Sequence, residues 1–155
     1  LSMHPKHEFK IFNSRRTPKE LNLKLTDNLG NYQNAKLVHF NSSAPNLFED
    51  CLKESALKFV TPDSANLVFE SLSTQGQTYL VQIEDPSYRR IFGAKKIRDS
   101  MNELVLSKRV GVVSILNKKG NVCISKLERP SLHFEPLAEV EKVAFSIMKF
   151  MDQQK

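Results

Sequence analysis

The sequence lacks most of the features that mark a specialised class of protein. It has no tryptophan, only two cysteines, and only five glycines and seven prolines among 155 residues. A glycine and proline content this low argues against a disordered or low-complexity chain. No apolar run reaches the roughly 18 residues that a transmembrane helix needs, so we expect no membrane span.

Known catalytic and metal-binding motifs are also missing from the chain. It contains no GxGxxG, GxxxxGK[ST], HExxH or GxSxG pattern, and neither cysteine has His or Cys partners at metal-ligand spacing. Cys51 and Cys123 fall in patterns typical of a helix and a strand, which favours two free thiols and a reducing compartment. We therefore predict a protein that is not an enzyme, with no catalytic residue, metal or cofactor, in an intracellular location that is nuclear or cytoplasmic.

The best-defined local pattern is the stretch from Val110 to Leu127. Two apolar segments flank the polar sequence Asn-Lys-Lys-Gly at residues 117–120, and its glycine is suited to the positive φ of a tight turn. This pattern predicts a β-hairpin.

Other segments alternate or repeat with the periods of strands and helices. Leu21, Leu23 and Leu25 alternate with polar residues, which predicts a half-buried strand from Glu20 to Thr26. Further strands are predicted at residues 36–40, 66–72 and 78–84. Amphipathic patterns predict helices at residues 47–59, 94–108 and 136–152.

Taken in order, these segments predict an α+β fold. Pairs of strands joined by short loops alternate with helices in a ββα-ββα-ββα order, and such connections favour antiparallel pairing. We expect an antiparallel sheet of six to seven strands with three main helices packed on it. The chain then forms a single two-layer domain from residue 8 to 155, preceded by a lead-in at residues 1–7, and it could be excised from a longer protein.

Positive charge is concentrated in one part of the chain. The net charge is +6, and residues 86–129 carry eleven Lys or Arg residues against three acidic ones. A basic face of this kind attracts polyanions or acidic proteins. The candidate contacts are Arg89, Arg90, Lys95, Lys96, Arg98, Lys108, Arg109, Lys118 and Lys119.

Two functions are compatible with these observations. The first is a protein-interaction domain, one module of a larger complex, whose partner contacts Phe145, Phe150 and Met151 on the final helix; a homo-oligomer is one form of such a complex. The alternative is nucleic-acid binding through residues 86–129, with the hairpin tip following the phosphate backbone. Only Tyr88 and Phe92 lie nearby as stacking rings, so the sequence favours the protein partner.

Overall fold

The computed structural model describes residues 6–41, 44, 46–84, 95–118, 121–131, 135–137 and 149. The chain falls into two compact units, Leu1–Asp50 and Cys51–Lys155. Within the described residues the protein is of the α+β class, with four helices and two sheets of two and four strands. The expected single sheet of six to seven strands is not confirmed, and the single domain stays a prediction.

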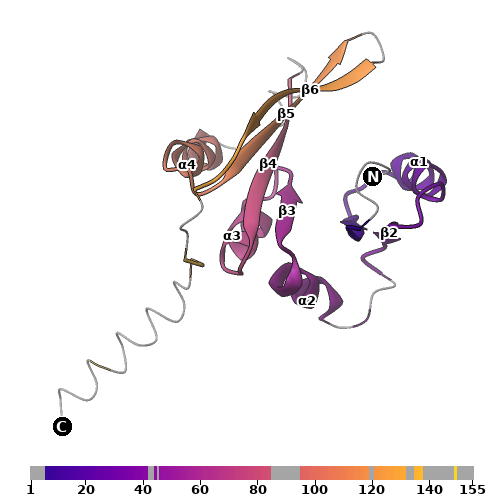
Figure 1. The fold of residues 1–155 in the computed structure, drawn as a ribbon, viewed down its shortest axis with the longest axis horizontal. Coiled ribbons are helices and arrows are strands. Elements are labelled where there is room, and N and C mark those ends of the chain that lie inside the picture. The colour runs from indigo at the N-terminus through magenta and orange to yellow at the C-terminus, as the bar shows by residue number, and fades with distance from the viewer. Residues whose placement is uncertain are drawn as a thin grey trace. The chain divides into compact units, whose positions relative to one another are not determined.

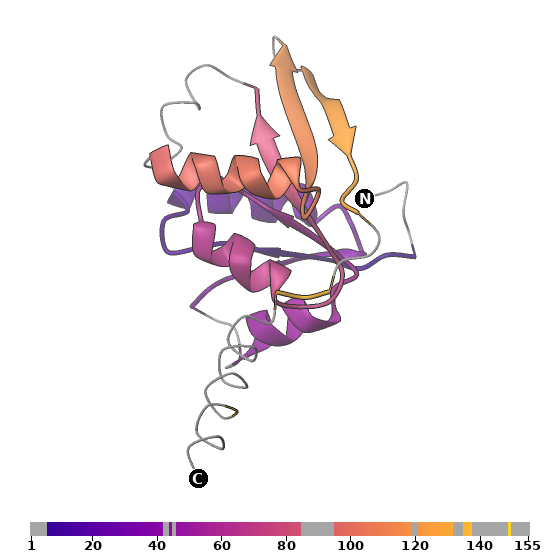
Figure 2. The same cartoon turned by 90° about the vertical axis from the view of Figure 1, so that its left-hand side faces the viewer.

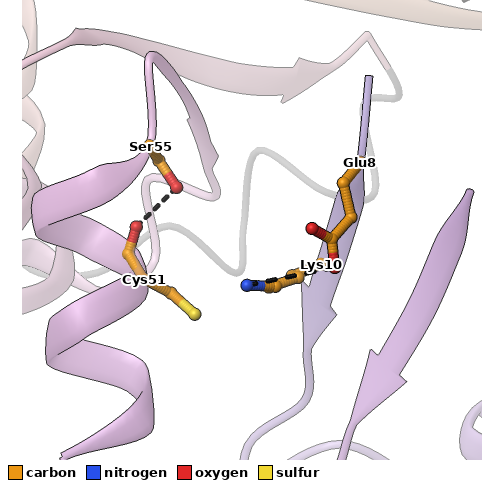
Figure 3. A network of polar contacts seen from close by, with 4 residues as sticks. All are labelled: Glu8, Lys10, Cys51 and Ser55. Atoms are coloured by element: carbon orange, nitrogen blue, oxygen red, sulfur yellow. Dashed lines mark hydrogen bonds and ion pairs between the residues drawn. The ribbon is translucent and has the colours of Figure 1, made fainter. Parts of the chain in front are cut away.

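The first unit is a strand–helix–strand motif. β1 (Phe9–Phe12) and β2 (Ala35–Val38) pair in parallel, and α1 (Lys19–Leu29) connects them. Parallel strands need such a crossover because the end of the first strand and the start of the second lie at opposite ends of the sheet. On β1, Lys10 Nζ lies 4.0 Å from Glu8 Oε1 in an exposed ion pair (Figure 3).

The predicted strand at residues 20–26 is wrong, because these residues belong to α1. The leucines at positions 21, 23 and 25 alternate, but Leu21, Leu25 and Leu29 are also spaced four apart along a helical face. Pro18 immediately precedes the helix, a position where a proline costs no helical hydrogen bond. The longer helical period therefore determines the structure of this segment.

The predicted helix at residues 47–59 is correct only in its first half. α2 (Leu47–Glu54) ends where Ser55 Oγ donates a hydrogen bond to the carbonyl oxygen of Cys51 (Figure 3). Residues 57–60 instead form β3 (Leu57–Val60), in which exposed and buried side chains alternate. The Phe-Val pair that closes β3 has high strand propensity, which explains the change of structure.

The second unit contains a four-stranded sheet in the order β3-β4-β5-β6. β3 pairs in parallel with β4 (Gln77–Ile83), which pairs in parallel with β5 (Gly111–Lys118). α3 (Ala65–Leu72) and α4 (Lys95–Leu106) form the two crossovers. The predicted hairpin is confirmed, since β5 pairs antiparallel with β6 (Asn121–Glu128).

The expectation of a wholly antiparallel sheet is wrong for a local reason. Residues 66–72 were expected as a strand but form α3, which turns a presumed hairpin into a parallel crossover. Val68 and Ser71, three residues apart, are buried on one side of α3, while Phe69 is exposed. This spacing is helical, but α3 has only eight residues. A segment this short fits both periods, so periodicity alone does not identify it.

The core of the second unit lies between the sheet and its two helices. Figures 1 and 2 show α3 and α4 on the same side of the strands. The core contains Val60, Val68, Leu80, Met101, Leu104 and Val110. Val60 and Leu80 are neighbours across the β3–β4 pair, so this side of the sheet is the one that the helices cover.

Two further predictions concern membrane crossing and the final helix. Among the described residues, none of the helices has the length and apolar character that a bilayer crossing requires. The predicted helix at residues 136–152 lies almost wholly outside the described residues.

Candidate interaction surface

The side of the second sheet that faces away from α3 and α4 is almost entirely apolar. Side chains along a strand alternate between the two sides, and the register of the four strands aligns residues that share a side. We call this side the distal face. Its apolar members are Leu57, Phe59, Tyr79, Val81, Ile83, Val113, Ile115, Ile124 and Leu127.

The edge strands of the distal face are accessible to solvent, whereas Tyr79 and Val113 on the central strands are buried. Phe59 is 55% exposed and Leu127 is 58% exposed, although they lie on opposite edge strands of the sheet. Leu57 and Ile124 are exposed as well. Single exposed apolar residues are ordinary, but exposed apolar pairs on both edge strands of the same side of a sheet indicate a surface that binds something.

A pair of aromatic rings lies at the β3 side of the distal face. The Phe59 and Tyr79 rings stack with centroids 5.3 Å apart and an angle of 24° between their planes. Tyr79 is buried, and its hydroxyl donates a 3.0 Å hydrogen bond to Gln77 Oε1. The bond fixes the Tyr79 ring, so the exposed Phe59 ring rests on a rigid support.

The distal face carries no charged side chain among the described residues of β3, β4 and β5. The charged pair on β6 belongs to the other side, because Lys126 and Glu128 align with residues that share the helix-covered face. Lys126 Nζ and Glu128 Oε1 lie 2.8 Å apart, so each charge is compensated locally. The distal face is therefore complementary to another uncharged apolar surface.

The helix-covered side contains one buried charge, that of Lys58. Only 4% of Lys58 is exposed, and its Nζ donates 2.6 Å hydrogen bonds to the carbonyl oxygens of Ser71 and Gln75. It also donates to Thr74, at 2.6 Å to Oγ1 and 3.2 Å to the carbonyl oxygen. These oxygens lie in the last turn of α3 and just after it, where unsatisfied carbonyls favour a cation.

Burial lowers the pKa of Lys58 from 10.5 to about 8, because the ammonium group loses its hydration. No ion pair with a described acidic residue offsets this effect. The side chain is therefore a structural tie between β3 and the end of α3, since it is enclosed by oxygen atoms and closed to solvent.

The turn that Lys58 holds is also fixed from a second side. Thr74 Oγ1 lies 3.0 Å from the carbonyl oxygen of Leu52, and Gln77 N donates to the carbonyl oxygen of Ala56 at 2.8 Å. Gly76 has a φ of +92°, and a Cβ there would lie 2.2 Å from the carbonyl oxygen of Ser55. The close approach and the positive φ both require glycine.

A polar cluster in the first unit joins the ends of its two strands. Asn13 Nδ2 lies 2.9 Å from Asn22 Oδ1 and 3.0 Å from His39 Nδ1. Asn13 Oδ1 accepts a 2.8 Å hydrogen bond from the Phe40 backbone. These hydrogen bonds give Asn13, Asn22 and His39 a structural role, because they link the residues that follow the two strands to α1. Across the described residues, no group of three or more His, Cys, Asp or Glu side chains is arranged to hold a metal.

The structure separates the described members of the predicted basic site. Arg98 is exposed in the first turn of α4, whereas Lys108 and Arg109 follow its last turn. Ten residues of helix span about 15 Å, so these cations lie at opposite ends of α4. Lys95, Lys96 and Lys118 are described in their backbone only, and Arg89, Arg90 and Lys119 lie outside the described residues. The basic site stays a prediction.

The predicted partner contacts Phe145, Phe150 and Met151 also lie outside the described residues. Sequence reasoning missed the distal face because residues 57 and 59 were included in a helix. The alternation Leu-Lys-Phe-Val at residues 57–60 was the available signal, since it places both exposed apolar side chains on one side of a strand.

Comparison with known proteins supplies a family. A family model described as mitochondrial fission ELM1 matches residues 1–151 of the chain. No curated protein and no solved structure matches the chain. The family description points to the mitochondrion, so the expected nuclear or cytoplasmic location is wrong and is replaced by an association with mitochondria.

Proposed function

Because the chain belongs to the mitochondrial fission ELM1 family, we propose that it acts in mitochondrial fission as a non-enzymatic protein-interaction module of a larger complex. The observation that carries this proposal is the distal face, where an uncharged apolar surface extends from Leu57 on one edge strand to Leu127 on the other. A surface of this kind binds proteins through apolar burial around an aromatic anchor, here Phe59.

The chemistry of the described residues supports an interaction role over a catalytic one. Lys58, whose pKa is the most clearly displaced among the described groups, is enclosed by backbone and hydroxyl oxygens with no route to a substrate. His39 is engaged by Asn13 at 3.0 Å. Lys58 Nζ is hydrogen-bonded to three carbonyl oxygens besides Thr74 Oγ1, which is the environment of a structural cation rather than of a free general base.

Nucleic-acid binding through residues 86–129 is the weaker alternative. A compact phosphate-binding patch needs cations that lie together, and Arg98 and Lys108 are separated by the length of α4. No described aromatic side chain accompanies them as a base-stacking platform.

The proposal is tested by disrupting the distal face in the full-length protein. Cells that carry Leu57→Ser together with Phe59→Asp in place of the natural residues should show altered mitochondrial length, measured by fluorescence microscopy. The matched control is Leu106→Asp on the outer side of α4, where the leucine is 84% exposed and away from the distal face. Normal mitochondrial length in the double variant, at equal protein level and thermal stability, would contradict the proposal.

A further inference from the structure

We propose that the distal face binds amphipathic α-helices of a partner protein. This inference rests on the proposed function, because it names the kind of partner that the same surface accepts.

Parallel sheets are almost always covered by helices on both sides. The strands β3, β4 and β5 are parallel, and β4 and β5 contain short apolar runs at residues 79–81 and 112–113, whose members alternate between the two sides of the sheet. Such runs are typical of strands buried on both faces, whereas strands exposed on one side alternate with polar residues. Among the described residues of this unit, α3 and α4 cover only one side (Figure 1).

The dimensions of the distal face match those of helices. Four strands at a spacing of about 4.8 Å are about 19 Å wide, which is the width of two helices packed about 10 Å apart. The seven residues of β4 extend about 23 Å, the length of a helix of roughly 14 residues. On the other side, the same strands are covered by helices of 8 and 12 residues.

A second copy of the chain is a poorer fit to this face. The footprint is roughly 400 Å² from the strand spacing and length. A stable protein–protein interface buries about 800 Å² on each partner. Two distal faces stacked on each other would therefore form only a weak contact, whereas partner helices seated here can continue to other surfaces of the partner.

The composition of the face specifies the composition of the helix. Since the described strand residues of the distal face carry no charge, a charged side chain placed against them would be desolvated without a counter-ion. The partner helix must therefore present an uncharged apolar stripe. The exposed ring of Phe59, supported by Tyr79, is the anchor around which this stripe packs.

The test uses the full chain with isotope-labelled methyl and amide groups and a synthetic peptide as the probe. The peptide has 14 residues, with leucine and alanine along one side of the helix and lysine and glutamate on the other. A side-chain staple holds it helical, because free peptides of this length form marginally stable helices. The control peptide has the same composition with the stripe interrupted by glutamate. Shifts that saturate with the first peptide alone, at Val81, Ile115, Ile124 and Leu127, are the expected result.

Two variants complete the experiment. Phe59→Asp should weaken binding of the helical peptide at least about tenfold, since an aromatic anchor carries much of an interface's affinity. Leu106→Asp should leave affinity unchanged. The proposal is overturned if the helical peptide causes no shifts, or if the interrupted peptide binds equally well. It is also overturned if the face shows concentration-dependent shifts without peptide, because these indicate a second copy of the chain.

The two proposals fail in different ways. If the double variant at residues 57 and 59 alters mitochondrial length but the peptide does not bind, the interaction role stands and the helical partner is wrong. If the peptide binds and mitochondrial length is unchanged, the proposed role in fission fails. The face then binds helices without acting in fission.

Discussion

The two sides of the β3–β6 sheet both carry apolar residues, but only the helix-covered side also carries charged ones among the described strand residues. On the helix-covered side Val60, Leu80 and Val112 are buried. On the distal side Tyr79 and Val113 are buried at the centre, while Leu57 and Phe59 at the edge are about half exposed. Neighbouring residues of the same strand contribute to both sides. Hydrophobic character alone therefore does not define the core, because a residue is stabilising only if another element covers it. The apolar residues that no described helix of the unit covers identify the candidate interaction surface.

The largest expected effect comes from the helix-covered side. Leu80 is fully buried between the sheet and the helices, so Leu80→Ala should lower the free energy of unfolding by about 4 kcal/mol through lost burial and a residual cavity. The measurement is urea denaturation followed by circular dichroism. Leu127→Ala, at an exposed position of the distal face, is the matched control and should cost less than about 1 kcal/mol. Equal losses in the two variants would remove the distinction between the two sides.

The second prediction concerns the one charge on the helix-covered side. The pKa of Lys58 is lowered by burial to about 8, from 10.5 in the unfolded chain. Between these values the unfolded chain holds a proton that the folded protein has lost, so the free energy of unfolding rises with pH. Relative to Lys58→Met, the natural chain should gain up to about 3 kcal/mol from pH 8 to 10.5, and nothing below pH 8.

Urea denaturation of both proteins at several pH values between 7 and 10.5 measures this difference. Lys53→Met on α2, which removes an exposed lysine in the same way, is the matched control. Curves for the natural chain and Lys58→Met that stay parallel across the whole range would show that folding does not alter proton binding by Lys58.

Part of the fold could be predicted from sequence because some segments have only one consistent reading. The sequence of the β5–β6 hairpin has a glycine between two apolar runs, and α4 is long enough for its 3.6-residue period to be clear. Helix α3 has only eight residues, and in α1 the leucines satisfy both periods. These two segments determine whether neighbouring strands are parallel, so two local errors changed the predicted topology of the sheet.

The candidate surface was less predictable than the fold. Recognising it requires the register of all four strands and the side on which α3 and α4 pack, and both depend on contacts between distant residues. Lys58 illustrates the difficulty, because a lysine between Leu57 and Phe59 reads as a solvated residue. Its burial depends on carbonyl oxygens at residues 71, 74 and 75, whose position follows only from the crossover through α3.

The smallest effect is expected at Phe59, and it separates stability from binding. Phe59 contacts Tyr79 but is 55% exposed, so Phe59→Ser should lower the free energy of unfolding of the isolated chain by no more than about 1 kcal/mol. The same change should strongly weaken binding of an apolar helix, because the ring is desolvated only in the complex. Urea denaturation and peptide titration of the same protein preparation measure both effects. If stability instead falls by as much as in Leu80→Ala, the ring belongs to the core of the folded chain, and the distal face is not a binding surface.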